Sequence, residues 1–546
     1  MNGFRLKDFP AFASSAMAAL VLTAPFFTPV FTPAIVSAQF AGDPATDGQG
    51  PVQNGGKPGA SSKLDRLREN VRRFTLPNGL RVIFYRRANA PVFSGQVWIR
   101  VGGVNEKEGQ TGLAHLLEHM AFKGSTTLGT KNFAEEEPLL VELDSIMANP
   151  SAADAPKNLA ETYKKLEALW INEEFSRIYE HNGADGLNAG TGTDYTAYFV
   201  NLPNVAFELW CWMETDRLLN PVFRQFYKER EVVHEERRSN YDDNPSGKMY
   251  EQMLATAFTV HPYRFSTIGK PEDLRRLSRE ELIKLYQTYY HPENMVISVV
   301  GDLDFETVRA MVEKYFGRLK RSRQPIPQVT AVEPPQTEPR EATVFFDAEP
   351  QFVMAYHKPA FPNVDDAYFG VLHSYLSGGR SSLLYKELVV DKKLALDVGT
   401  SEAPGVQFPS VFYVRAMPAP GVAPERLRDE IQAVFDRLKT TPISEEDLQA
   451  VRRRARIGLL GGFNSNQGMA ETMAESELIW GDWATMFKFY DLLEKATAGD
   501  VMRLAKTYLN VSNRTFIKLE RPPGSGKQAP PGAAGVKTGT DTGAKK

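Results

Sequence analysis

The sequence predicts an α+β protein made of two homologous α/β domains, each a mainly antiparallel sheet packed with helices. The main observation is a repeated pattern. Paired strands, an alternating strand and amphipathic helices occur near residue 72 and again after residue 340. The second observation is size, because 546 residues with 42% hydrophobic content are enough for two domains that each bury a core.

The elements of the two copies follow the same order. Residues 72–87 predict a β-hairpin around Pro-Asn-Gly, and residues 92–103 alternate as a strand does before a helix. In the second copy, residues 342–359 predict two strands, and helices follow over 365–379 and 380–390. Each copy then adds a further strand and more amphipathic helices.

Composition sets the expected boundaries. Residues 39–66 and 521–546 are rich in Gly, Ala, Pro and Ser. They lack the apolar side chains that offset the entropy of ordering, so we expect a flexible linker and a flexible tail. The Pro-rich residues 321–339 predict a link between the copies. The first domain then covers 67–320 and the second covers 340–520.

The N-terminus, residues 1–38, is typical of a secretory signal peptide. Arg5 and Lys7 precede an apolar run, and Val36 and Ala38 are the small residues of an A-x-A-like cleavage site. An uncleaved membrane anchor is the alternative, but three prolines interrupt the run before the ~20 apolar residues of a spanning helix. We therefore predict an exported protein, periplasmic in a Gram-negative cell, with no integral membrane segment after cleavage.

Charge and cysteine content limit the function further. The chain has 64 basic and 67 acidic residues, and its net charge of −3 gives no reason to expect nucleic acid as a partner. Cys211 is the only cysteine, so no disulfide can form within the chain. Its aromatic-rich helical surroundings favour a buried structural thiol over a nucleophile.

The stretch HLLEH, residues 115–119, predicts a metal site on a helix. His115 and His119 are four residues apart, so both imidazoles lie on one face and can reach one ion. Glu118 projects from the same side without taking a ligand position, where a general base belongs. Two solvated histidines on a surface helix are the alternative, but four apolar neighbours indicate burial: Leu113, Leu116, Leu117 and Met120.

A catalytic zinc site needs a third protein ligand, and residues 227–241 are the best source. Glu229, Val232, Val233 and Glu236 fall on one predicted helical stripe. If both valines face the core, the two carboxylates are brought inward and require a cation or a donor. We therefore choose Glu236 as the third ligand and Glu229 as a carboxylate that orients a ligating histidine. The alternative is a solvated run of charges.

Other residues in these patterns are expected to have no catalytic role. Glu235 lies about 100° round the helix from Glu236, toward Arg238 and solvent. His234 is off the stripe and is expected at the surface. In the second copy, the helix that matches the motif helix contains His373 but no second histidine and no nearby glutamate. Chemistry is therefore expected in the first copy.

These motifs resemble the inverzincin zinc peptidases of the pitrilysin, insulin-degrading enzyme and mitochondrial processing peptidase family. The resemblance rests on GLAHLLEHMAFKGS, NAGTGTDYTAYFVNLP and EREVVHEERR, and it covers roughly residues 68–520. It implies one zinc ion per chain and assigns five roles: His115, His119 and Glu236 as metal ligands, Glu118 as the base, and Glu229 as an assisting carboxylate. It also implies that a strand carrying Asn188, Ala189 and Thr191 pairs with the substrate backbone.

Glu236 follows His119 by more than a hundred positions, which is longer than the spacing in the family. The surplus is expected in a helical insertion at about 134–184, read as two amphipathic helices with apolar faces formed by Leu139, Leu140, Leu143, Leu159, Leu166 and Leu169. A lid, a specificity element, a partner surface and simple packing on the outside are equally open.

Family members enclose the substrate between two units of this size, so the resemblance implies that this chain forms half of a clamshell chamber. It therefore implies a homodimer, or a heterodimer with a related subunit. The second unit commonly supplies an Arg and a Tyr that steady the substrate, and the sequence does not place that pair.

The predicted function is an exported zinc endopeptidase for extended peptides or unfolded polypeptides. A catalytic or non-catalytic subunit of a heterodimer, or a peptide-binding partner without turnover, is the alternative.

Overall fold

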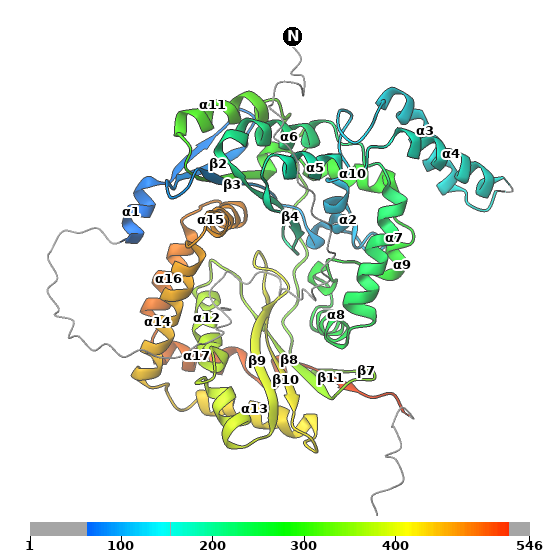
Figure 1. Ribbon diagram of the computed structural model, residues 1–546. Helices are drawn as coiled ribbons and strands as arrows, with labels where there is room; N and C mark the ends of the chain where they lie inside the picture. The colour runs from blue at the N-terminus through cyan, green and yellow to red at the C-terminus, as the bar shows by residue number, and fades with distance from the viewer. Residues whose placement is uncertain (1–62, 153, 524–546) are drawn as a thin grey trace, which may run out of the picture.

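The computed structural model describes residues 63–152 and 154–523 (Figure 1). The predicted signal peptide at 1–38, most of the predicted linker at 39–66, and nearly all of the predicted tail lie outside the described residues. Helix α1 (Lys63–Asn70) begins within the expected linker. The folded body therefore starts four residues earlier than composition suggests.

The first sheet has six strands in the order β1-β2-β6-β3-β5-β4. Only β2 and β6 run parallel, and the other neighbours are antiparallel. The predicted hairpin at 72–87 is confirmed, since β1 and β2 pair directly. The strands are β1 (Arg72–Thr75), β2 (Arg81–Arg86), β3 (Val92–Ile99), β4 (Asp185–Thr191), β5 (Thr196–Pro203) and β6 (Met295–Gly301).

The second sheet repeats five of these strands in the order β7-β11-β8-β10-β9. Its directions match as well, with β7 and β11 parallel and the rest antiparallel, so the prediction of two homologous domains is confirmed. The two strands expected within 342–359 exist but do not pair, because β11 lies between them. The strands are β7 (Arg340–Phe345), β8 (Gln351–Lys358), β9 (Ala395–Ala403), β10 (Ser410–Pro418) and β11 (Arg514–Glu520).

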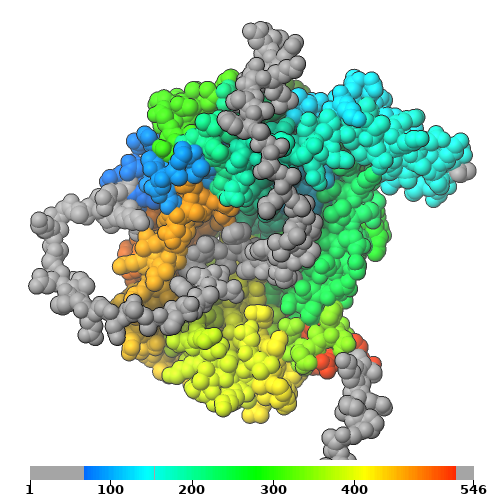
Figure 2. Space-filling model, viewed as in Figure 1, coloured from blue at the N-terminus to red at the C-terminus, as the bar shows by residue number. Residues whose placement is uncertain are grey.

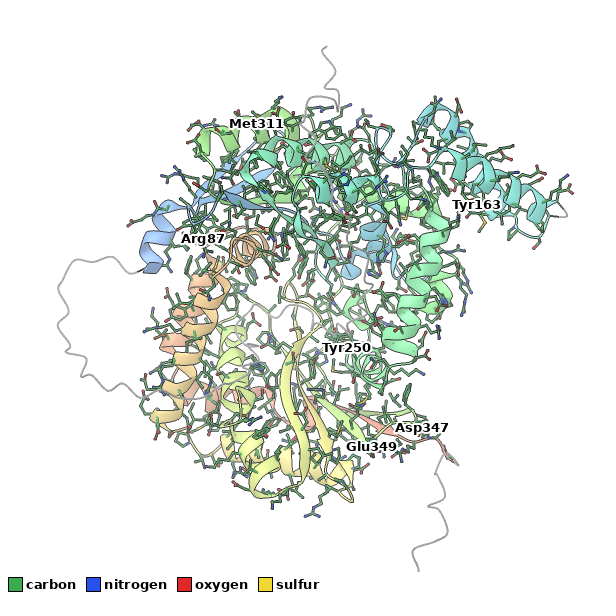
Figure 3. All side chains as sticks on the ribbon, viewed as in Figure 1. Arg87, Tyr163, Tyr250, Met311, Asp347 and Glu349 are labelled. Carbon is green, nitrogen blue, oxygen red and sulfur yellow. The ribbon has the colours of Figure 1, made fainter. Side chains whose placement is uncertain are left out.

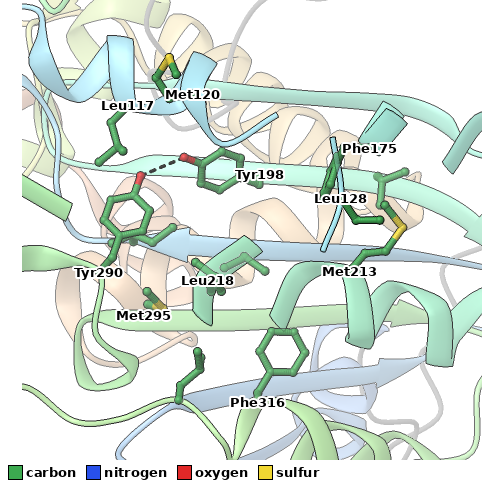
Figure 4. Packing of buried hydrophobic residues seen from close by; sticks show 14 of the residues in the cluster. Leu117, Met120, Leu128, Phe175, Tyr198, Met213, Leu218, Tyr290, Met295 and Phe316 are labelled. Atoms are coloured by element: carbon green, nitrogen blue, oxygen red, sulfur yellow. Dashed lines mark hydrogen bonds between the residues drawn. The ribbon is translucent and has the colours of Figure 1, made fainter. Parts of the chain in front are cut away.

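Helices α2 to α11 lie between β3 and β7 along the chain, and α2, α5, α6 and α11 among them pack on the first sheet. They are α2 (Leu113–Met120), α3 (Phe133–Ala148), α4 (Ala155–Leu169), α5 (Glu174–His181), α6 (Phe207–Leu219), α7 (Phe226–Arg237), α8 (Pro245–Ala257), α9 (Pro271–Leu274), α10 (Arg279–Tyr289) and α11 (Phe305–Phe316). The core under the motif helix α2 contains Leu117, Tyr198 and Tyr290, and the two tyrosine hydroxyls bond to each other at 2.9 Å (Figure 4). Cys211 lies fully buried in the same core, as predicted.

The two halves exchange one helix each across the molecule (Figure 1). Helix α15 (Asn466–Trp480) packs on β3 and β6 of the first sheet, where Met469 and Met473 join its core. Helix α8 packs on the second sheet through Met253 and Leu254, and Tyr250, labelled in Figure 3, packs against the same cluster. The remaining helices are α12 (Val364–Ser377), α13 (Pro424–Leu438), α14 (Glu445–Gly462), α16 (Thr485–Lys495) and α17 (Ala498–Tyr508). Each sheet is therefore completed by the other half of the chain.

The predicted helical insertion forms an arm that stands out from the body (Figures 1 and 2). Helices α3 and α4 pack against each other, with Leu140, Leu143 and Leu166 buried between them. Two helices were expected over this stretch, and α5 is a third. The arm is anchored by a fully buried ion pair, in which Glu136 Oε1 lies 2.9 Å from Nε of Arg224.

Candidate metal centre

The motif helix α2 is fixed at its N-terminus by a buried carboxylate. Glu106 accepts hydrogen bonds from the backbone N–H of Gly112 at 2.8 Å and of Ala114 at 2.7 Å. Gly112 has φ +89°, and a Cβ there would collide with the carbonyl of Ile268, so glycine is required. The predicted apolar positions of α2 are buried: Leu113, Leu116, Leu117 and Met120. This burial argues against the surface-helix alternative.

Helices α2 and α7 bring the three predicted ligands together. Oε2 of Glu236 lies 3.8 Å from Nε2 of His115 and 3.5 Å from Nε2 of His119. Ligand atoms about 2.1 Å from a tetrahedral zinc ion are about 3.4 Å apart, so these separations fit such an ion. All three ligand atoms lie within 4.8 Å of one another, and no other such group occurs in the described ranges.

The second nitrogen of His119 is held by the predicted assisting carboxylate. Nδ1 of His119 lies 3.1 Å from Oε1 of Glu229, which leaves Nε2 free to face Glu236. The other oxygen of Glu229 lies 2.6 Å from Nζ of Lys123. Sequence reasoning missed Lys123, although its position four residues after His119 puts it on the same side of the chain.

The charges around His119 favour a proton shared between this ring and two carboxylates when no metal is bound. Burial lowers the pKa of His119, but hydrogen bonds with Glu229 and Glu236 outweigh it and raise that pKa to about 9. Burial works against ionisation of Glu229 and Glu236, yet His119 holds the pKa of both carboxyls below the usual value. Burial lowers the pKa of His115. These shifts favour a protonated His119 ring between the two carboxylates when no metal is bound.

Glu118 is not one of the three clustered ligands, and a residue of the first sheet holds its carboxylate. The hydroxyl of Thr191, the last residue of β4, donates a hydrogen bond of 2.7 Å to Oε2 of Glu118. This contact orients the carboxylate and links the motif helix to the first sheet. The sequence suggested Thr191 only as a substrate contact, so this role was missed.

The predicted substrate strand, β4, lies at the edge of the first sheet. Within the described part of the chain it pairs with β5 alone, so one row of its backbone groups is open. Asn188 and Ala189 lie on this strand, and Oδ1 of Asn188 accepts a hydrogen bond of 2.9 Å from N of Ala189. An unpaired edge is the feature that β-augmentation needs.

The helical stripe on α7 differs from the prediction at one position. Val233 is fully buried, but Val232 is 51% exposed. At about 100° per residue, Val233 lies about 40° to one side of Glu229. Val232 lies about 60° to the other side, away from the buried Phe226. The two carboxylates therefore lie at the border of the buried face, where they reach the metal site.

The neighbouring residues of α7 gave one correct and one wrong expectation. Glu235 faces solvent and pairs with Arg238 at 2.7 Å, as predicted. His234 was expected at the surface, but it is half-buried, and its Nε2 is buried with no hydrogen-bond partner among the described residues.

The second domain holds no comparable group in the residues described. His373 lies on α12, and its Nδ1 is 2.7 Å from Oγ1 of Thr400. Burial lowers the pKa of His373 to about 4. His373 is half-buried, and this shift favours a neutral ring.

Models of two protein families match the chain. Residues 81–138, which include the HLLEH motif, match "Insulinase (Peptidase family M16)". Residues 276–455 match "Peptidase M16 inactive domain". The second match contains none of the residues that form the candidate metal centre.

Curated proteins and solved structures agree with these matches. Zinc protease PqqE of Helicobacter pylori is 29% identical over 452 residues, which cover 82% of this chain and 92% of that protein. An uncharacterised zinc protease of Mycobacterium leprae is 26% identical over 83% of this chain and 93% of its own length. The crystal structure of a protease from Helicobacter pylori has a TM-score of 0.71 at 27% identity and covers 82% of this chain and 99% of that one. The periplasmic protease PqqL from Escherichia coli has a similar fold, with a TM-score of 0.63 at 16% identity, and this chain covers 48% of it.

Proposed function

The chain belongs to the M16 family of peptidases, and we propose that it is an exported zinc-dependent endopeptidase for extended peptides or unfolded polypeptides. The observation that carries the proposal is the meeting of His115, His119 and Glu236, on two helices more than a hundred positions apart, at separations that suit one zinc ion. Two surface helices with solvated charged residues, the alternative reading, would not be expected to bring these three side chains together.

The residues of the chain divide the catalytic work. When bound, zinc supplies a Lewis acid that polarises a peptide carbonyl and lowers the pKa of a water molecule. Glu118 takes the proton from the attacking water and returns it to the leaving amine. Thr191 holds the Glu118 carboxylate through its hydroxyl. Glu229 holds Nδ1 of His119, which leaves Nε2 available as a metal ligand, and Lys123 is the counterion of Glu229.

The open edge of β4 supports an extended substrate. A peptide that adds to this edge must present unpaired backbone N–H and C=O groups, which a folded protein rarely does. Asn188, Ala189 and Thr191 would then run beside the substrate, and Thr191 connects that strand to Glu118.

Two further parts of the proposal concern assembly and export. This chain covers 48% of PqqL, which fits a half-unit that completes its chamber with a second copy or a related subunit. Among the described residues no helix is long and apolar enough to span a membrane. The basic residues, apolar run and small-residue site at positions 1–38 support export.

The direct test uses the purified mature chain. We expect one zinc per chain by elemental analysis and chelator-sensitive cleavage of a quenched fluorescent peptide library. Glu118→Gln should abolish cleavage and keep the zinc, whereas His115→Ala should lose it. A chain that binds zinc but cuts only after a related subunit is added would favour the heterodimer. Unchanged zinc in His115→Ala would reject the site.

A further inference from the structure

The second domain reaches the catalytic strand through one hairpin. The loop between β9 and β10, residues 404–409, lies against the turn that joins β4 to β5. Thr193, in this turn, donates from its hydroxyl to the carbonyl of Pro404 at 3.0 Å. The turn begins directly after Thr191, the residue that holds Glu118.

Asp194 is the centre of this contact. Its Oδ2 accepts hydrogen bonds from the backbone N–H of Val406 at 2.7 Å and of Gln407 at 3.0 Å. The hydroxyl of Tyr263 donates to Oδ1 of Asp194 at 2.7 Å and accepts from N of Phe408 at 3.2 Å. Asp194 is only 2% exposed, so these bonds are its compensation for burial.

The close contact between the hairpin and Asp194 requires a glycine at position 405. A Cβ on Gly405 would collide with both Oδ2 of Asp194 and the hydroxyl of Tyr263. The hairpin can therefore approach Asp194 this closely only because glycine stands at this position. Val406 and Phe408 also pack their side chains against the surrounding apolar clusters, so the hairpin is itself well supported.

The other side of the turn rests on the first domain. The carbonyls of Gly192 and Thr193 accept hydrogen bonds from N of Gly103 at 3.3 Å and N of Val104 at 2.9 Å. These residues precede Glu106, which caps the motif helix. The turn is thus held between the loop that leads to the motif helix and the hairpin of the second domain.

We propose that Asp194 is a positioning residue, through which the second domain fixes the β4–β5 turn and thereby the place where Thr191 holds Glu118. The proposal rests on the proposed peptidase function. It gives the second domain, which contains no metal group in the described residues, a defined part in catalysis: it sets the geometry of the base from a distance. A misplaced base slows proton transfer without weakening metal binding, because Asp194 does not contact the ligands.

The test compares Asp194→Asn with Asp397→Asn, an exposed aspartate at the far end of the same hairpin. We expect Asp194→Asn to lower kcat about tenfold or more, with KM and zinc content unchanged. Hydrogen exchange in the metal-free chain should become faster at the amides of residues 192–196. Tyr263→Phe, which removes one donor, should have a smaller effect in the same direction. If Asp194→Asn does not fold, Tyr263→Phe is the variant that tests the proposal.

A double-mutant cycle separates positioning from general loosening. In a Thr191→Val background, Asp194→Asn should change kcat by less than about twofold, because both residues act through Glu118. An equal loss of kcat in both backgrounds, faster exchange with unchanged kcat, or unchanged exchange would each overturn the proposal. If the wild-type chain cleaves nothing, the proposed function fails first. An active wild type with an unaffected Asp194→Asn rejects the positioning role alone.

Discussion

The ammonium of Lys123 lies 2.6 Å from Oε2 of Glu229, and the opposite oxygen of that carboxylate faces His119. Lys123→Met keeps the length of the side chain but removes the charge. We expect zinc affinity to fall about tenfold, since partners that orient a ligand typically contribute this much. Competition with a chelator of known affinity measures the effect.

Lys107→Met is the matched control, because Lys107 is exposed and lies in the loop between β3 and α2. Lys123→Arg should retain most of the affinity by restoring a cation beside Glu229. Equal affinities for Lys123→Met and the control would show that Glu229 needs no counterion.

Zinc binding should release a proton from His119. Its pKa in the metal-free chain is raised to about 9 by Glu229 and Glu236, so the ring is protonated at pH 7 and must lose that proton to bind a metal. Affinity should therefore rise about tenfold per pH unit from pH 7 and level off near pH 9. Titration calorimetry in buffers of different ionisation enthalpy counts the protons. A pH-independent affinity over this range would contradict the assignment.

The sequence predicts much of this site because its signals are local. The spacing of His115, Glu118 and His119 defines one helical face, and the stripe on α7 selects Glu236 from a dense run of charges. Val232 was wrongly predicted to be buried, because helical spacing gives the direction of a side chain around the helix but not where the buried face ends. Asp194 has no local signal at all, since its hydrogen-bond partners are Tyr263 and a hairpin more than two hundred positions away.

The same limit applies to the fold. Alternation and turn residues predicted most strands, and the repeat predicted two domains. Amphipathic patterns show that α8 and α15 each bury a face, but they do not say which sheet covers it. The exchange of these helices and the insertion of β11 between β7 and β8 depend on long-range packing, which outweighs sequence proximity.

The arm formed by α3 and α4 should depend on one buried ion pair. Glu136 is 0% and Arg224 2% exposed, and Arg224 also donates to the carbonyls of Ser125 and Leu128 behind the motif helix. Glu136→Gln leaves the guanidinium without its counterion, so we expect a loss of about 3–5 kcal/mol in the free energy of unfolding. Chemical denaturation measures it, with the exposed Glu135→Gln as the control. In limited proteolysis of Glu136→Gln, the first cuts should fall in the arm, near Tyr163 (Figure 3). Equal stability of the two variants would mean that the arm is held by apolar packing alone.

Glu475 should make stability depend on pH. It lies on the exchanged helix α15, is 8% exposed, and has one buried oxygen without a hydrogen-bond partner among the described residues. Burial, together with the nearby carboxyls of Glu471 and Asp194, raises the pKa of Glu475 from 4.5 to about 8. The folded chain therefore keeps a proton that the unfolded chain has already lost. The contribution of this group to stability is full below pH 4.5 and disappears as the pH rises through 8.

Glu475→Gln keeps the shape of the side chain and stays neutral at every pH. We expect it to unfold less readily than the wild type at pH 8 and about equally at pH 5, with a difference on the order of a few kcal/mol, since one pKa unit corresponds to about 1.4 kcal/mol. Urea denaturation at both pH values gives the comparison, and Glu446→Gln on the exposed side of α14 is the control. If the variant and the wild type show the same pH dependence, the Glu475 carboxyl is already ionised in the folded chain.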